Sequence, residues 1–569
     1  MPTMSPPNRP AARRRWRGQT PSRRLLCALL ATLLGLAPAA PVGAQGQPAS
    51  EVRLPALGES ASDDFNLGQE KRVGEQIMRE IRRDPDYLDD PQLLDYLQSI
   101  WQPLVQAAKT RGDIGADTVR LFPYESFLVR DRSVNAFALP GGYVGVHLGL
   151  MALTATPDEL ASVLGHELSH ITRRHIARSI AANSRSSSLG LAAMLLGLLV
   201  ASRAASVDAA QAAVVGGQAA MIQAQLNFSR DMEREADRSG LALMSLAGFA
   251  PSGMASMFDK LDQSSRLNDS GGFPYLRSHP LTVDRIGEAR QIVQAAGYAA
   301  SPPPAPLMHL LMQARSRVLM DPSAQAWRRL QDLDQRGAQA ALPLNDRIVG
   351  LYTGALASGR LREFARAERD ASAALALLAS AWPSGQDTAS TARPTGATLQ
   401  ARLALANLSA QLALAHGDVD RATLMLAEGS AGGPEDPSRT GLLLRAELAL
   451  AEGSAPALKR SGEALQTWVA EHRDDASAWQ WLAQTTDRQG QKLRSLRAEA
   501  ESQAALGNLP GAIDRLRAGQ QLARKGGAGT DFIEASVIDA RLRDMLAQRR
   551  ELLAEQRKQG GGSRGDAPE

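Results

Sequence analysis

Cysteine is almost absent from this sequence. Its 569 residues include one cysteine, Cys27, which lies in an apolar run near the N-terminus. A single cysteine cannot form a disulfide within the chain, so stability has to come from packing or from a bound metal. Aromatic residues are also scarce, at 4%. Alanine and leucine are abundant instead, which favours helices, and the length allows two to four domains.

A strong net charge is missing as well. The whole chain carries +4, and residues 1–44 contain seven arginines but no lysine and no acidic residue. Without that segment, the net charge of the remaining chain is about −3. The basic balance therefore belongs to the N-terminal segment, and it gives no support to a nucleic-acid partner.

The N-terminal segment has the features of an export signal. A basic region precedes the apolar run Leu25–Leu36, which is too short to span a membrane comfortably. Small residues at Val42, Gly43 and Ala44 form a cleavage site. We expect residues 1–44 to be a signal peptide cleaved near Ala44, and the product to reside in a bacterial periplasm. An uncleaved signal anchor is the alternative.

Chemistry is concentrated in one H-E-x-x-H motif. His166 and His170 are one helical turn apart, so both imidazoles can reach one metal ion. Glu167 is placed to take a proton from a metal-bound water. The segment Thr156-Pro157-Asp158-Glu159 predicts the helix start, with a capping box and a proline in the first turn. The bland alternative is an ordinary helix that happens to carry histidines.

A second acidic motif offers a third ligand. Glu233 and Asp237 lie four residues apart at the start of another predicted helix and share one face. One carboxylate can bind the metal while the other orients a ligand histidine. A solvated, charged helix start is the other interpretation. A metzincin site is excluded, because Arg173 and Ile176 occupy the positions that would need glycine and histidine.

Two further histidines lie close enough in the sequence to be considered. On a continuous helix His175 would lie on a different face from His170, so we expect it on the surface or behind a ligand. His279 precedes Pro280, which predicts an extended, loop-borne residue that is free to approach a metal. Taken alone, His279 could equally be an exposed loop histidine.

A hairpin signal precedes the H-E-x-x-H motif. Two β-prone runs flank a Pro-Gly-Gly bend. A strand edge beside a metal helix can bind an extended peptide through backbone hydrogen bonds. A plain structural hairpin is the alternative. The residues that we assign to a substrate-binding edge are Asn135, Ala136, Phe137, Gly141 and Gly142.

Most of the remaining chain is predicted to be helical. Helices are expected over Phe65–Arg83 and from Asp90-Pro91 onward, and a strand over Val119–Val129. Residues 186–202 are uncharged and apolar but slightly short for a membrane span. They predict a buried or loop-covering helix, with peripheral contact to a membrane as the alternative.

The C-terminal half has the signature of helical repeats. The proline-rich stretch Ser301–Pro306 marks a domain boundary. Beyond it, Gly417, Gly453 and Gly490 end Ala/Leu-rich runs at steps close to the tetratricopeptide period of roughly 34 residues. An irregular helical bundle is the alternative.

Four motifs in one order resemble a known family. They are V-N-A-F-A-L-P-G-G, H-E-x-x-H, F-S-R-D-M-E-R-E-A-D and S-H-P-L-T-V-D-R-I. The chain resembles the periplasmic β-barrel assembly-enhancing proteases, in which a gluzincin domain is joined to tetratricopeptide repeats. The resemblance is strong over residues 60 to 300 and loose over the repeats.

The resemblance implies a role for each motif residue. His166, His170 and Glu233 would bind one Zn²⁺, and Glu167 would be the general base. Asp237 would support a ligand from behind, and His279 would cap the zinc and keep the enzyme latent.

It also implies a zinc endopeptidase of the periplasm with a chaperone-like role. The enzyme would act on unfolded or misassembled outer-membrane proteins and contact the assembly machinery through its repeats. The alternative is a non-proteolytic, zinc-stabilised chaperone or adaptor. The expected fold is mainly α with a small β-sheet, divided into a signal peptide (1–44), a metalloprotease domain (45–300), a linker (301–308), an α-solenoid of tetratricopeptide-like repeats (309–555) and a disordered tail (556–569).

Overall fold

The computed structural model describes residues 65–182, 229–267, 273–295, 297, 305–381, 396–429, 435–526 and 531–560. The expected signal peptide, the apolar segment 186–202 and residues 301–304 of the proline-rich linker lie outside these ranges. None of the described helices is both long enough and apolar enough to cross a membrane.

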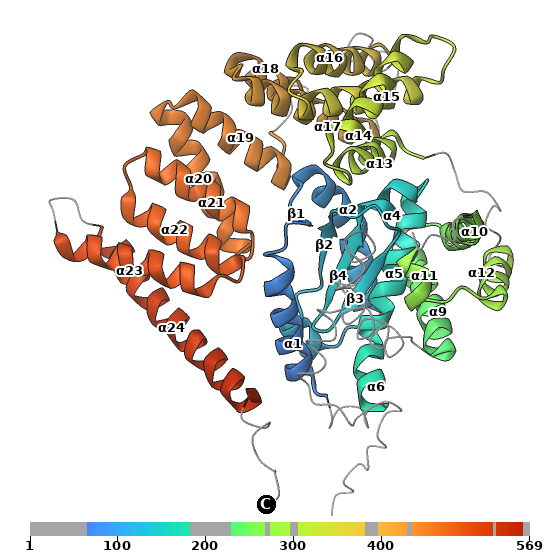
Figure 1. Ribbon diagram of the computed structural model, residues 1–569, viewed down its shortest axis with the longest axis horizontal. Helices are drawn as coiled ribbons and strands as arrows, with labels where there is room; N and C mark the ends of the chain where they lie inside the picture. Colours follow the sequence, from blue (N-terminus) through green and yellow to red (C-terminus); the bar gives the residue numbers. More distant parts are fainter. Residues whose placement is uncertain are drawn as a thin grey trace, which may run out of the picture. The chain divides into compact units, whose positions relative to one another are not determined.

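A small sheet lies at the centre of the N-terminal region (Figure 1). It contains β1 (Tyr87–Leu88), β2 (Glu125–Val129), β3 (Ala136–Leu139) and β4 (Tyr143–His147), in the order β1-β2-β4-β3. The β2–β4 pair is parallel, whereas β1–β2 and β3–β4 are antiparallel. Strand β3 therefore lies at an edge, with β4 as its neighbour in the sheet.

Helices surround this sheet. In chain order they are α1 (Leu67–Ile81), α2 (Pro91–Arg111), α3 (Ala116–Leu121), α4 (Leu148–Leu153), α5 (Pro157–Thr172), α6 (His175–Ala182), α9 (Arg230–Leu246), α10 (Ser252–Leu267), α11 (Pro274–Ser278) and α12 (Val283–Ala295).

Helix α5 begins where the sequence predicts. The Thr156 hydroxyl accepts a hydrogen bond from the Glu159 N–H at 3.2 Å, and Pro157 occupies the first turn. The Glu159 carboxylate reaches back to the N–H of Ala155, one residue before the expected partner of a capping box. All but its last residue and its first two are buried, so α5 is a core helix that carries polar residues.

Helices α5 and α9 cross at two glycines. A Cβ atom on Gly240 would lie 3.0 Å from the backbone nitrogen of His166 and 3.1 Å from the carbonyl carbon of Gly165. Ordinary contacts of a Cβ atom begin at about 3.4 Å, so only glycine allows this approach. The close crossing brings the acidic motif of α9 next to the histidines of α5.

In the described residues of the C-terminal region all regular elements are helices, so the expected mainly-α fold with a small sheet is confirmed. Its elements are α13 (Leu307–Leu319), α14 (Ala324–Gln331), the 3-10 helix η3 (Asp332–Ala338), α15 (Leu344–Arg360), α16 (Phe364–Ala381), α17 (Gly396–His416), α18 (Val419–Gly429), α19 (Arg439–Glu452), α20 (Ala455–Glu471), α21 (Ala476–Arg488), α22 (Lys492–Ala505), α23 (Leu509–Lys525) and α24 (Phe532–Gly560).

The packing does not break at the predicted linker. One continuous core extends from Leu88 in β1 to Met425 in α18. It includes Leu311 of α13 and Tyr352 of α15 together with Leu164 of α5. The first C-terminal helices thus share a core with the N-terminal region, while α19 to α24 contribute two separate cores.

Two local predictions need correction. The strand predicted over Val119–Val129 is wrong in its first half, because Ala116–Leu121 form α3 and only Glu125–Val129 form a strand. Pro123 lacks an N–H, and Tyr124 has a positive φ of 48°, so the chain turns between the two elements. Helix α24 also continues to Gly560, beyond the repeat boundary predicted at residue 555.

Candidate metal centre

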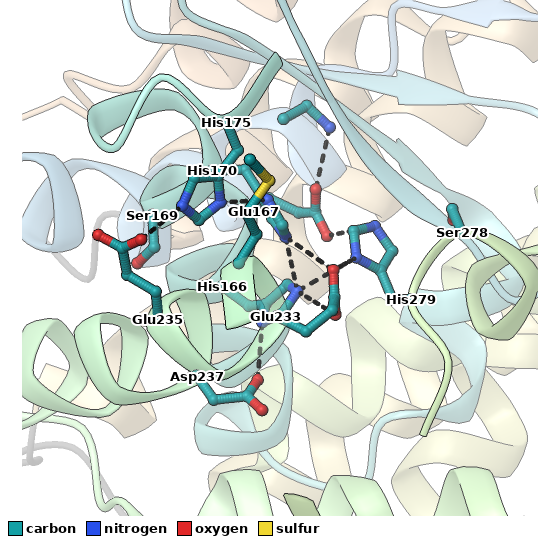
Figure 2. A network of polar contacts seen from close by, with 12 residues as sticks. His166, Glu167, Ser169, His170, His175, Glu233, Glu235, Asp237, Ser278 and His279 are labelled. Atoms are coloured by element: carbon teal, nitrogen blue, oxygen red, sulfur yellow. Dashed lines mark hydrogen bonds and ion pairs between the residues drawn. The ribbon is translucent and has the colours of Figure 1, made fainter. Parts of the chain in front are cut away.

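Four buried side chains from three segments point toward one another (Figure 2). Helix α5 supplies His166 and His170, α9 supplies Glu233, and His279 follows α11. One nitrogen or oxygen of each lies within 4.8 Å of the others, and each residue is at most 2% exposed. The structure thus brings together residues that the sequence places far apart.

The spacing of these atoms fits one tetrahedral metal ion. The Nε2 atoms of His166 and His170 are 2.9 Å apart, and Nδ1 of His279 is 3.3 Å from Nε2 of His166. Oε1 of Glu233 lies 3.0 Å from Nδ1 of His279 and 3.5 Å from Nε2 of His170. Metal bonds of about 2.0–2.1 Å in a tetrahedron put neighbouring ligand atoms roughly 3.3 Å apart. The residues therefore fit a bound cation.

The far side of His166 is held by a carboxylate. Its Nδ1 lies 2.9 Å from Oδ1 of Asp237, which is itself buried. Because this nitrogen faces a carboxylate, it carries the proton and donates it, which leaves Nε2 to face the cluster. Asp237 thus occupies the orienting position expected from the sequence.

His170 is supported in a different way. Its Nδ1 lies 2.9 Å from Nδ1 of His175, and Nε2 of His175 lies 3.2 Å from Oε2 of Glu235. The sequence predicts His175 either on the surface or behind a ligand. It is fully buried, so the surface position is wrong and the position behind His170 is observed. The helix ends at Thr172, and Arg174 has a positive φ of 53°, so the chain folds back toward His170.

The electrostatics of the cluster favour a positive charge at its centre. Burial would lower the pKa of His166, but hydrogen bonds with Asp237 and Glu233 raise it to about 10. Burial would raise the pKa of Glu233, but His279 and His166 hold it well below its usual range. Burial and the neighbouring charge of His166 both lower the pKa of His170. A metal cation would supply the charge that these acids attract.

Glu167 faces the same cluster. Its Oε2 accepts a hydrogen bond from the N–H of Ala138 at 3.0 Å, and its Oε1 lies 3.5 Å from Nε2 of His279. Oε1 is buried and has no hydrogen-bond partner among the described residues. Burial raises the pKa of Glu167, which makes it a better proton acceptor than an exposed glutamate.

The predicted substrate edge is divided by the structure. The Asn135 carbonyl accepts a hydrogen bond from the N–H of His147. The backbone groups of every second residue, starting with Asn135, are therefore directed toward β4. Ala136 and Ala138 therefore direct their backbone groups to the open edge, and the N–H of Ala138 is taken by Glu167. The Phe137 backbone pairs with β4 opposite Gly145.

Gly141 and Gly142 do not belong to that edge. They form the turn between β3 and β4 with positive φ values of 80° and 91°. A Cβ atom on Gly141 would meet the backbone of α1, and one on Gly142 would meet Phe122. Their role is to let this turn pack closely.

A buried arginine was not singled out by the sequence analysis. Arg285 of α12 binds both oxygens of Asp237, at 2.6 and 2.8 Å, and its Nη1 lies 2.9 Å from Oε2 of Glu233. The local sequence pattern does not reveal that this arginine is buried, because an arginine in the first turns of a helix is normally exposed to solvent.

Comparison with known proteins agrees with this geometry. Residues 92–293 match the model of peptidase family M48. This part of the chain is therefore similar to the M48 peptidases. The M48 match covers both helices that supply the cluster and the segment that carries His279. The M48 match and the relatives named as proteases and metalloendopeptidases support the expected metallopeptidase.

Relatives extend the similarity beyond this domain. The β-barrel assembly-enhancing protease of Escherichia coli (strain K12) is 28% identical over 88% of this chain and 92% of its own length. The protein of the same name from Yersinia pestis is 34% identical over 47% of this chain, and the match spans about half, 52%, of that relative. The mitochondrial metalloendopeptidase OMA1 of Schizosaccharomyces pombe is 29% identical over 39% of this chain and 61% of its own length. The expected resemblance to the β-barrel assembly-enhancing proteases is confirmed.

Proposed function

We propose that this chain is a periplasmic zinc endopeptidase that supports the assembly of outer-membrane β-barrel proteins and degrades misassembled ones. The observation that carries the proposal is the cluster of His166, His170 and Glu233, with Glu167 beside it. Two imidazoles and one carboxylate are a ligand set of catalytic zinc sites. The names of the relatives supply the class of substrate.

Each residue of the cluster has one task in this proposal. His166, His170 and Glu233 would hold the zinc, which supplies Lewis acidity that acidifies a water and polarises the scissile carbonyl. Glu167 takes the proton of the attacking water on its unpartnered Oε1 and passes it to the leaving amine. The backbone of Ala136 and the carbonyl of Ala138 align the substrate as an added strand.

His279 regulates the site in this proposal. Its Nδ1 faces the ligand atoms and its Nε2 faces Glu167, so it fills the space that a substrate needs. In this proposal the arrangement with His279 beside the cluster is the latent state, and activation requires the segment that carries His279 to move away. A ligand or client that stabilises the displaced segment would shift the population toward the active state.

The C-terminal helices serve as a docking region in this proposal. Successive antiparallel pairs such as α19–α20, α21–α22 and α23–α24 support a solenoid of tetratricopeptide-like repeats. We propose that it contacts the outer-membrane assembly machinery. Export would remove residues 1–44, so N-terminal sequencing of the periplasmic form should read from Gln45.

The decisive experiment replaces Glu167 by glutamine. Glu167→Gln keeps the shape and the hydrogen bond from Ala138 but removes the proton acceptor. We expect cleavage of an unfolded outer-membrane β-barrel protein to fall by at least about 100-fold, since general-base catalysis contributes roughly 10²–10⁴. Zinc content by mass spectrometry and helix content by circular dichroism should stay unchanged. Glu80→Gln, on the exposed surface of α1, is the control.

The same experiment separates the peptidase from the adaptor. An adaptor whose zinc is closed by four ligands, including His279, predicts that the wild type cleaves nothing under any condition. It also predicts that Glu167→Gln has no effect on assembly of outer-membrane proteins in cells. Both results together would replace the peptidase proposal by the adaptor.

A further inference from the structure

The guanidinium of Arg285 joins three parts of the centre that are separate in the sequence. Its Nε and Nη2 bind the two oxygens of Asp237 at 2.6 and 2.8 Å. Its Nη1 lies 2.9 Å from Oε2 of Glu233 and donates to the carbonyl of Pro280, also at 2.9 Å. The side chain is 4% exposed.

These contacts restrict the two carboxylates. The forked pair with Asp237 fixes the plane of that carboxylate, whose Oδ1 also accepts from Nδ1 of His166. On Glu233, Nη1 of Arg285 lies beside Oε2, which is also 3.5 Å from Nε2 of His166. The other oxygen, Oε1, faces His170 and His279. A buried arginine with two acidic partners is costly to disturb, because removing one charge leaves another unpaired.

The third contact reaches the segment that carries His279. Pro280 follows His279 directly, and the N–H of His279 donates to the carbonyl of Tyr275 at 2.8 Å. This segment is therefore held at both ends, by α11 on one side and by Arg285 on the other. If the segment moves outward, the Pro280 carbonyl leaves and Nη1 of Arg285 loses an acceptor in a buried place.

We propose that Arg285 is a positioning residue that couples the metal ligands to the His279 segment, so that neither changes alone. The inference rests on the proposed metal centre and names a means of its regulation. Displacement of the segment would weaken the contact between Arg285 and Glu233. Loss of the metal would in turn increase the mobility of the segment that carries His279.

The test measures metal affinity and segment mobility in the same full-length mature protein. Arg285→Met removes the charge and the fork. We expect zinc affinity, from competition with a chromogenic chelator, to fall about 10- to 100-fold, as is typical when a residue behind a metal ligand is lost. Amide hydrogen exchange over residues 275–281 should speed up in the same variant.

Two further variants sharpen the test. Arg285→Lys keeps the charge but not the fork and should recover only part of each change. Arg290→Met removes an exposed arginine of the same helix, paired with Asp259, and should change neither quantity. If Arg285→Met fails to fold, Asp237→Asn removes the partner of the fork while keeping its shape, and the same two changes are expected.

The outcomes are distinct. Coupling is overturned if only one of the two quantities changes, or if both stay within twofold of the wild type. Neither readout involves peptide cleavage. If Arg285→Met shows both changes while the wild type cleaves no substrate under any condition, the peptidase proposal is refuted and the coupling stands.

Discussion

The crossing of α5 and α9 at glycine gives a quantitative test of how the centre is built. Gly240→Ala adds one methyl group at the point where the helices touch. That methyl carbon would lie 3.0 Å from the His166 nitrogen and 3.1 Å from the carbonyl carbon of Gly165. Both neighbours are backbone atoms of a core helix, so neither can rotate away, and the helices have to separate by about 0.4 Å to restore ordinary contact.

Two opposing effects set the size of the result. Replacing glycine by alanine inside a helix stabilises by about 0.5–1 kcal/mol. Overpacking a core contact costs about 1–3 kcal/mol. The second effect wins, so we expect a net loss of roughly 1 kcal/mol in the free energy of unfolding.

The same displacement reaches the ligands. Glu233 lies on the same helix, seven residues and about 10 Å along the axis from Gly240. A shift of about 0.4 Å exceeds the roughly 0.2 Å tolerance of metal–ligand distances, so zinc affinity should fall about tenfold.

The assay is chemical denaturation of the zinc-free protein together with chelator competition for zinc. Gly287→Ala is the matched control, since a Cβ atom there meets nothing within 4 Å in α12. It should stabilise by about 0.5–1 kcal/mol and leave zinc affinity unchanged. The reasoning is refuted if Gly240→Ala is as stable as the control and binds zinc as tightly as the wild type.

Three other predictions concern single side chains. His279→Ala removes the imidazole facing the ligands and should raise the rate of cleavage of an unfolded β-barrel protein; a lower rate would contradict the latch. His175→Leu takes away the hydrogen-bond partner of the His170 Nδ1 and should weaken zinc binding about tenfold in chelator competition, whereas unchanged affinity would argue against this support. Burial and the charge of Asp334 raise the pKa of Asp370 to about 6. The Asp370 carboxylate therefore binds a proton more tightly in the folded state than in the unfolded state. Stability should therefore fall as pH rises from about 4 to 6, and Asp370→Asn should flatten this part of the curve of melting temperature against pH; an unaltered curve would show that the pair does not titrate this way.

Local sequence determined the elements that carry the chemistry. The cap at Thr156 and the apolar spacing that follows it predict α5, and the spacing of His166 and His170 places both on one face. These predictions hold because helix caps and helical periodicity depend on residues three or four positions apart. The mainly-α composition was predictable for the same reason.

Three predictions made from neighbouring residues alone differ from the structure. Local reasoning began a strand at Val119, because apolar and polar residues alternate weakly there, although Pro123 and the turn at Tyr124 interrupt the segment. It treated the helix after His170 as continuous, whereas the chain turns at Arg174 and buries His175. The proline-rich stretch looked like a boundary, but a shared core crosses it.

What only the tertiary structure decided is which distant groups meet. The sequence offered Glu233 and His279 as possible partners for the histidine pair and left the place of His175 open, and it did not single out Arg285. The crossing at Gly240 and the return of the chain after α11 put Glu233 and His279 among the ligand atoms and His175 behind them. The physical reason is that burial makes each charge depend on partners far away in the chain, and those partners are chosen by how helices pack rather than by neighbouring residues.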